Sequence, residues 1–104
     1  MRDNIRSFTL DGRKMQGREQ AHAYIKEVLG LADYYGSNLD ALHDMLGEMY
    51  PVSITIEHAD VMEGREYASK LLNMLRTLDR SEEEFELREI NDRIEDDDFS
   101  EVSD

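Results

Sequence analysis

Three short segments of this sequence have the pattern of β-strands, and their separation limits the folds that the chain can adopt. Residues 5–10 and 85–90 mix strand-forming and polar side chains, and residues 52–56 alternate between apolar and hydroxyl side chains. Such alternation is typical of strands that bury one face of a sheet. Because strands connected through helices lie parallel, the sequence predicts one α/β domain with a three-stranded parallel β-sheet packed by helices, in the order β-α-α-β-α-β.

The helical segments are marked by apolar residues at spacings of three and four. The first covers about residues 18–29, and Gly30 follows it as a C-terminal stop. The second covers residues 38–49 and ends before Pro51, which begins the second strand, and the third covers about residues 65–78. We expect these helices to lie mainly on one face of the sheet, as in a small α/β sandwich.

Three ring side chains near the first two helical segments carry separate expectations. His22 lies off the apolar stripe of the first helix, so we expect it to be partly exposed or to cap a neighbour. Tyr35 is expected in the core. Tyr34 is assigned equally to the core and to an interface.

The net charge of −13 is unevenly distributed along the 104 residues. Residues 27–64 contain eight acids and no Lys or Arg, and residues 79–104 have a net charge of −10, whereas residues 1–26 are net positive. Direct binding to nucleic acid or to an anionic membrane is disfavoured, because phosphate contacts require clustered Lys and Arg. A basic protein partner fits, since complementary electrostatic fields speed encounter.

Other compositional features exclude several classes of protein. The sequence contains no Cys, so it has neither a disulfide framework nor a thiolate zinc site. It has no apolar run near the ~20 residues of a membrane span and no apolar signal-peptide core, so we expect a cytoplasmic protein. A monomer is favoured as a separate expectation. It also lacks a glycine-rich phosphate loop, a cysteine nucleophile and a convincing acid–base pair, so we expect neither enzymatic activity nor a cofactor.

The chain is organised around residues 33–46. Gly36 is expected to supply the flexible position that turns the chain after two tyrosines. Asn38 stands where a helix N-cap is expected, with its side-chain oxygen able to accept a backbone N–H of the first turn. The helix that follows has one apolar face and one acidic face without a cation, formed by Asp40, His43, Asp44, Gly47 and Glu48. Carboxylates four residues apart repel each other, so this pattern is unfavourable for folding alone.

The run Tyr34-Tyr35-Gly36-x-Asn38-Leu39-Asp40-Ala41-Leu42-x-Asp44 resembles the signature of the barstar family. These small acidic proteins inhibit secreted ribonucleases of the barnase type, and they share a three-stranded parallel sheet packed by helices. The resemblance extends over about residues 7–90 but is specific only within residues 34–46. It implies a protein inhibitor of the antitoxin or immunity type, whose partner is a basic nuclease.

The resemblance also implies a role for individual residues. In the family, the helix after the Tyr-Tyr-Gly turn enters the nuclease active site, where its carboxylates occupy the places of RNA phosphates. Asp44 would then be the central anchor, Asp40 would pair with a neighbouring cation, and Tyr34 would cover an active-site histidine. Close contacts would come from four further residues, namely Gly36, Asn38, Leu39 and Ala41.

The sequence departs from the family pattern after the signature. His43 stands where the family has tryptophan, so stacking area is lost and a titrating group is gained. The chain between the signature and Pro51 is also shorter than in the family. A second acid that the family supplies from the helix before the last strand falls here at Thr77, and Glu48 and Asp79 are both candidates to replace it.

Three other interpretations remain open at this stage. The acidic face could belong to a general interaction module of barstar-like fold whose partner is not a nuclease, or it could be a solvated helix face. Asp40, His43 and Asp44 also have the side chains of a metal site, but ligands on a single helix rarely complete a coordination shell, so we predict no metal.

Residues 1–90 are predicted to form the domain, and residues 91–104 an acidic, mobile tail.

Overall fold

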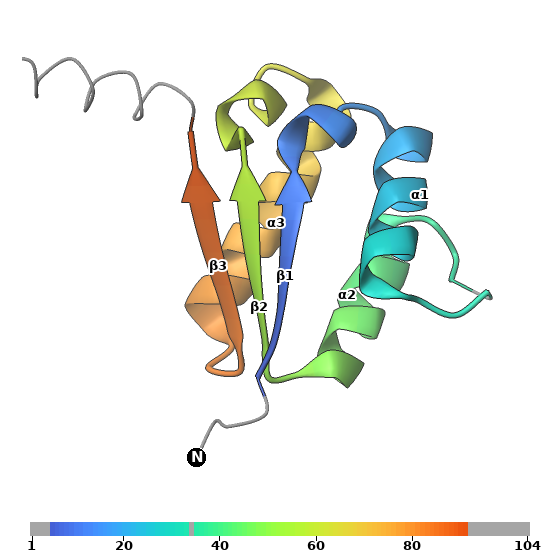
Figure 1. Ribbon diagram of the computed structural model, residues 1–104, viewed down its shortest axis with the longest axis vertical. Helices are drawn as coiled ribbons and strands as arrows, with labels where there is room; N and C mark the ends of the chain where they lie inside the picture. The colour runs from blue at the N-terminus through green and yellow to red at the C-terminus, as the bar shows by residue number, and fades with distance from the viewer. Residues whose placement is uncertain (1–4, 34, 92–104) are drawn as a thin grey trace, which may run out of the picture.

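The fold was determined as a computed structural model, which describes residues 5–33 and 35–91. Tyr34 and the predicted tail after Asn91 lie outside the described residues. The elements follow the predicted order β-α-α-β-α-β, with two short 3₁₀ turns (Figure 1): β1 (Arg6–Asp11), η1 (Gly12–Lys14), α1 (Arg18–Leu29), α2 (Leu39–Met49), β2 (Val52–Glu57), η2 (Ala59–Met62), α3 (Glu66–Ser81) and β3 (Phe85–Ile90). The single-domain α/β fold is therefore confirmed.

The sheet has the order β1-β2-β3, and both pairs of strands are parallel. Its register places Phe8, Ile54 and Leu87 side by side across the three strands. The apolar residues of β2 are buried, whereas the alternating Ser53 and Thr55 are only partly buried. Figure 1 shows α3 behind the sheet, where it covers one face, and α1 and α2 beside β1.

Helix α3 supplies the largest buried stripe of any described helix: Ala68, Leu71, Leu72, Leu75 and Leu78. Full burial of a leucine side chain stabilises the fold by about 1.5–3 kcal/mol, so this stripe is a main source of stability. The helix continues to Ser81, beyond its predicted end near residue 78. The sequence has no glycine or proline there, and the Ser81 hydroxyl donates to the Thr77 carbonyl within the last turn.

Two polar contacts attach the end of α3 to β3. The Arg76 guanidinium donates to Glu89 at 2.7 Å and to Glu63 at 2.8 Å, which joins α3, β3 and the segment after η2. The Asp79 carboxylate accepts a hydrogen bond of 3.1 Å from the backbone N–H of Leu87. This contact occupies a donor on the outer edge of β3, and edge donors of this kind otherwise favour pairing with another chain.

Helix α1 ends as predicted. Gly30 has a positive φ of 69° and its N–H donates to the carbonyl of Lys26. Glycine is favoured here because a left-handed backbone brings a Cβ too close to the carbonyl oxygen. None of the helices in the described part of the chain is long and apolar enough to cross a membrane.

Candidate functional site

The start of α2 is fixed by the side chain of Asn38. Its Oδ1 accepts a hydrogen bond of 2.7 Å from the backbone N–H of Ala41, and the residue itself has extended backbone angles. This is the predicted N-cap, which satisfies one of the helix's free donors and stabilises it by about 1 kcal/mol. Below the cap, α2 buries Leu42, Leu46 and Met49.

The turn before the cap differs from the prediction. Ser37, and not Gly36, has the left-handed backbone, with φ of 57°. Glycine favours such a backbone because it lacks a Cβ, but a single serine can adopt this conformation at a cost of roughly 1–2 kcal/mol. Gly36 is not among the positive-φ residues, and a Cβ there would lie 3.4 Å from Ala41 Cβ and 3.5 Å from Asn38 Nδ2, which are ordinary contact distances.

The acidic face of α2, defined here as Asp40, His43, Asp44 and Glu48, is exposed to solvent. Among residues 5–33 and 35–91, no side chain forms a hydrogen bond or ion pair with its three carboxylates. Asp40 lies in the first turn, where the helix dipole favours a negative charge, but the last turn contains no basic residue. Asp44 and Glu48 therefore lie four residues apart without electrostatic compensation.

Two shallow depressions border the acidic face. One, with a volume of about 220 Å³, lies between α2 and the preceding turn, and its lining includes Tyr35, Gly36, Asp44 and Glu48. The other, of about 230 Å³, shares Glu48 with the first and extends toward the end of α1 and Arg6. Asp44 and Glu48 therefore help to line a concave surface on the protein.

His22 is buried, with 1% of its surface exposed, and the prediction of a partly exposed side chain was wrong. Its Nδ1 contacts the Tyr35 hydroxyl, and its Nε2 lies 2.6 Å from the Tyr67 hydroxyl. Burial, assisted by the nearby charge of Arg18, lowers the pKa of His22. Ile25, an apolar residue of the same helix, follows His22 by three positions. This spacing could have indicated that His22 faces the core.

The two tyrosines beside His22 are also shifted in their ionisation. Burial raises the pKa of the Tyr35 hydroxyl, and it raises the pKa of Tyr67 as well, so both remain protonated at neutral pH. The predicted position of Tyr35 in the core is confirmed, with 7% of its surface exposed. Tyr34, which was assigned equally to the core and to an interface, lies outside the described residues. Tyr67 was not singled out from the sequence.

On α3, both Thr77, the position of the family's second acid, and the candidate replacement Asp79 are engaged in the fold. The Thr77 hydroxyl donates to the Asn73 carbonyl at 2.9 Å, and Asp79 holds the backbone N–H of Leu87. Glu48, in contrast, lies on the acidic face of α2 itself. Within the described chain, no three His, Asp or Glu side chains are grouped as metal ligands would be, and this includes the set Asp40, His43 and Asp44.

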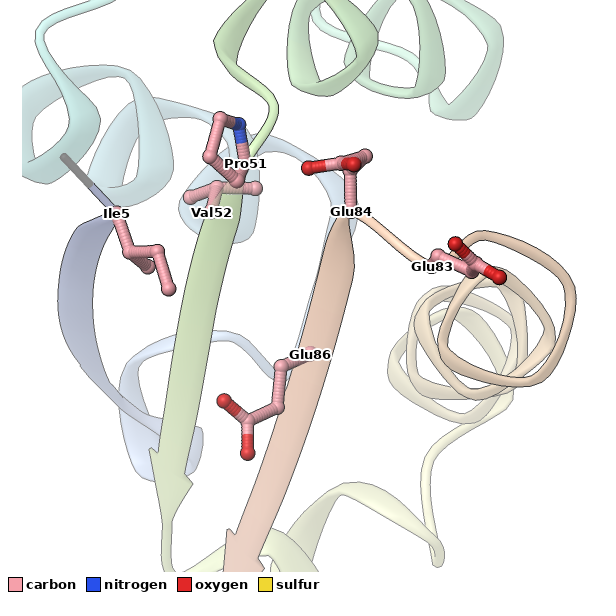
Figure 2. Close-up of a pocket in the computed structure, with 6 residues that line it drawn as sticks. All are labelled: Ile5, Pro51, Val52, Glu83, Glu84 and Glu86. Carbon is pink, nitrogen blue, oxygen red and sulfur yellow. The ribbon is translucent and has the colours of Figure 1, made fainter. Parts of the chain in front are cut away.

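A third depression, separate from the two beside α2, lies at the amino ends of the strands. Figure 2 shows the six residues that line it: Ile5, Pro51, Val52, Glu83, Glu84 and Glu86. The side chains of Glu83 and Glu86 extend in different directions. Its volume of about 30 Å³ has room for only one or two water molecules. It is too small to bind a larger ligand.

With the fold and the acidic helix in place, the sequence can be compared with known proteins. It matches the family described as "Barstar (barnase inhibitor)" over residues 5–97. The chain belongs to the barstar family. The match covers every described element of the fold, so membership rests on the whole domain and not on the signature before α2 alone.

A curated relative supports the same membership. Bacillus subtilis (strain 168) has a protein named "Putative ribonuclease inhibitor YrdF", to which this barstar-family chain is 34% identical over 68 residues. The aligned region covers 65% of this chain and 70% of that protein. The resemblance first seen in residues 34–46 is therefore confirmed at the level of the family.

Proposed function

We propose that this protein inhibits a ribonuclease by placing the acidic face of α2 in the enzyme's phosphate-binding site. The observation that carries the proposal is the row of exposed carboxylates without partners among the described residues, at Asp40, Asp44 and Glu48. Family membership and the name of the curated relative support ribonuclease inhibition as the general activity. They also favour an inhibitor over an enzyme.

The chemistry follows from what a ribonuclease needs. Its active site binds phosphate with Arg, Lys and His, and a carboxylate accepts the same charge-assisted hydrogen bonds as a phosphate oxygen. A capped helix presents its carboxylates in a fixed arrangement, so little entropy is lost when the complex forms. In this proposal Asp44 is the central anchor, Asp40 binds a neighbouring cation and Tyr34 covers an active-site histidine.

We assign the second acidic contact to Glu48. Asp79 already accepts from the Leu87 backbone and Thr77 carries no charge, whereas Glu48 is exposed one helical turn beyond Asp44. His43 faces the same side and replaces the aromatic area of the family with an exposed imidazole. Close contacts around these charges come from backbone atoms or small side chains of four residues: Gly36, Asn38, Leu39 and Ala41.

The biological role that fits is an antitoxin or immunity protein that acts as a cytoplasmic monomer without a cofactor. Its partner is a basic nuclease of the barnase type, and association between opposite charges is accelerated by electrostatic steering. High salt is expected to slow association sharply, because exposed charges are screened beyond about 10 Å at 0.1 M salt.

The test is an RNA-cleavage titration with barnase and with ribonucleases of the source organism. Stoichiometric loss of activity is expected with the unaltered chain. Asp44→Asn should weaken the complex by at least about 2 kcal/mol, or roughly 30-fold, which is the usual threshold for a hot spot and one for which the barnase–barstar pair is a known example. Asp60→Asn, which removes an exposed carboxylate from η2, is the matched control and should inhibit normally.

Two outcomes would contradict the proposal. Equal inhibition by Asp44→Asn and Asp60→Asn would show that the acidic face of α2 is not the contact surface. Binding to a protein without nuclease activity, with no effect on any ribonuclease, would instead identify an acidic interaction module of barstar-like fold.

A further inference from the structure

A buried histidine connects the turn before α2 to two other helices. His22 lies in α1, and its two ring nitrogens contact the hydroxyls of Tyr35, in the turn, and Tyr67, in the first turn of α3. The imidazole ring centre lies 5.6 Å from each tyrosine ring centre. Tyr35 therefore cannot move away from α1 without loss of a buried hydrogen bond and of ring packing.

Helix α1 holds the same turn at a second point. The Arg18 Nε donates to the backbone carbonyl of Ser37 at 3.3 Å, and Ser37 immediately precedes the N-cap residue Asn38. The two bonds from α1 thus fix both ends of residues 35–37, and this fixes the direction in which α2 starts.

The two contacts at His22 satisfy both ring nitrogens of a neutral imidazole. A neutral ring has one N–H donor and one acceptor nitrogen, so one tyrosine hydroxyl can donate to it while the other accepts from it. Protonation gives the ring two donors, and the hydroxyl that donated before loses its acceptor. That hydroxyl must turn its O–H away from the ring, and a buried O–H without an acceptor is costly, so protonation weakens the contact with one of the tyrosines.

We propose that His22 is a positioning residue for the acidic face of α2. In its neutral form it holds Tyr35 and the turn in the arrangement that binds a ribonuclease, and its protonation releases the turn and weakens binding at mildly acidic pH. In the described chain, the titratable or charged groups that act on the imidazole are Tyr35, Tyr67 and Arg18. Arg18 is positive, so it opposes a second positive charge at His22. The inference rests on the proposed function.

The first experiment measures binding to the inhibited ribonuclease near pH 7.5 and near pH 5.5. His43→Gln is the reference variant, because it removes the exposed imidazole on α2, and it is compared with the double variant His22→Gln/His43→Gln. Titration of the ribonuclease affects both equally. We expect the dissociation constant of the reference to rise on acidification by about fivefold more than that of the double variant. Equal rises would overturn the proposal.

The second experiment uses the free protein and can be done even if variants at His22 do not fold. Tyr67→Phe removes one hydroxyl and keeps the ring, and amide hydrogen exchange is followed at residues 36–41. Tyr24→Phe is the matched control, since the Tyr24 hydroxyl accepts from the Asp11 backbone at a distance from this turn. We expect severalfold faster exchange at residues 36–41 in Tyr67→Phe and no change there in the control.

The two proposals fail in different ways. Unchanged exchange in Tyr67→Phe overturns the positioning role even when the chain inhibits a ribonuclease. Faster exchange in a chain that inhibits no ribonuclease supports the role of His22 in holding the turn and overturns only the proposed function.

Discussion

Helices α2 and α3 are both amphipathic, but they treat their charges differently. On α3, Glu66 and Lys70 are one turn apart with 3.9 Å between their charged atoms, and Arg76 binds two carboxylates from other segments. On α2, Asp44 and Glu48 have no partner among the described residues. Both helices bury leucines, so the difference between them lies in whether their exposed charges have partners among the described residues.

The comparison separates charges that stabilise the fold from charges that, in the proposed function, contact a partner. The charges of α3 are satisfied within the domain, and its apolar stripe holds the sheet. The charges of α2 repel one another and its C-terminal turn lacks a basic residue, so this face costs some stability in the free protein. A partner with cations would offset that cost only in the complex.

The largest expected effect is on α3. Leu75→Ala removes a side chain that is 1% exposed, and we expect the free energy of unfolding to fall by about 2–5 kcal/mol because a cavity remains. Urea unfolding followed by circular dichroism measures this. Under conditions where the variant stays folded, ribonuclease inhibition should be retained, which is the reverse of the result for Asp44→Asn. Equal loss of inhibition in folded Leu75→Ala would break the comparison.

An intermediate effect is expected from pH. The pKa of His22 is lower in the folded protein than the ordinary value of 6.5, so the unfolded chain takes up the proton first as pH falls. Stability is therefore fully present above about pH 6.5 and decreases below it, by at most about 1.4 kcal/mol per pH unit for one proton. Unfolding curves measured from pH 7.5 to 5.5 test this direction.

The control for the pH effect is the exposed histidine of α2. His43→Gln should show the same decrease in stability as the unaltered chain, whereas His22→Gln should show a smaller one. A decrease that follows His43 would place the responsible proton on α2 and not in the contact between α1, the turn and α3.

The smallest expected effect is on the acidic face. Asp44→Asn combined with Glu48→Gln should raise the free energy of unfolding by a few tenths of a kcal/mol, because repulsion within α2 is removed. Glu66→Gln on α3 should lower it slightly, because the contact with Lys70 is lost. Changes of the same sign in both helices would show that the two charge patterns do not differ in their effect on the fold.

Most of the fold could be predicted because its signals are local. The strand 85–90 and the first helix were located to the residue, and Gly30 and Asn38 perform the capping roles read from the sequence. A cap is decided by bonds within about one turn of the chain, which a sequence displays directly. The end of α3 was missed because neither glycine nor proline marks it.

The residues of the candidate site divide in the same way. The exposed positions of Asp40, Asp44 and Glu48 follow from helical spacing alone, and the structure brings them to one face as expected. The left-handed backbone at Ser37 could not be read from residue type, because it depends on how α1 and α2 close the turn between them. The assignment of Tyr34 stays a prediction.

The sequence by itself determined the order of elements, the caps and the acidic face, since each depends on neighbours three or four positions away. Only the tertiary structure decided the environment of His22, whose partners lie 13 and 45 residues along the chain. It also decided that Asp79 bonds to Leu87. Such contacts depend on how helices pack against the sheet, and a buried polar group accepts whichever partner that packing brings within reach.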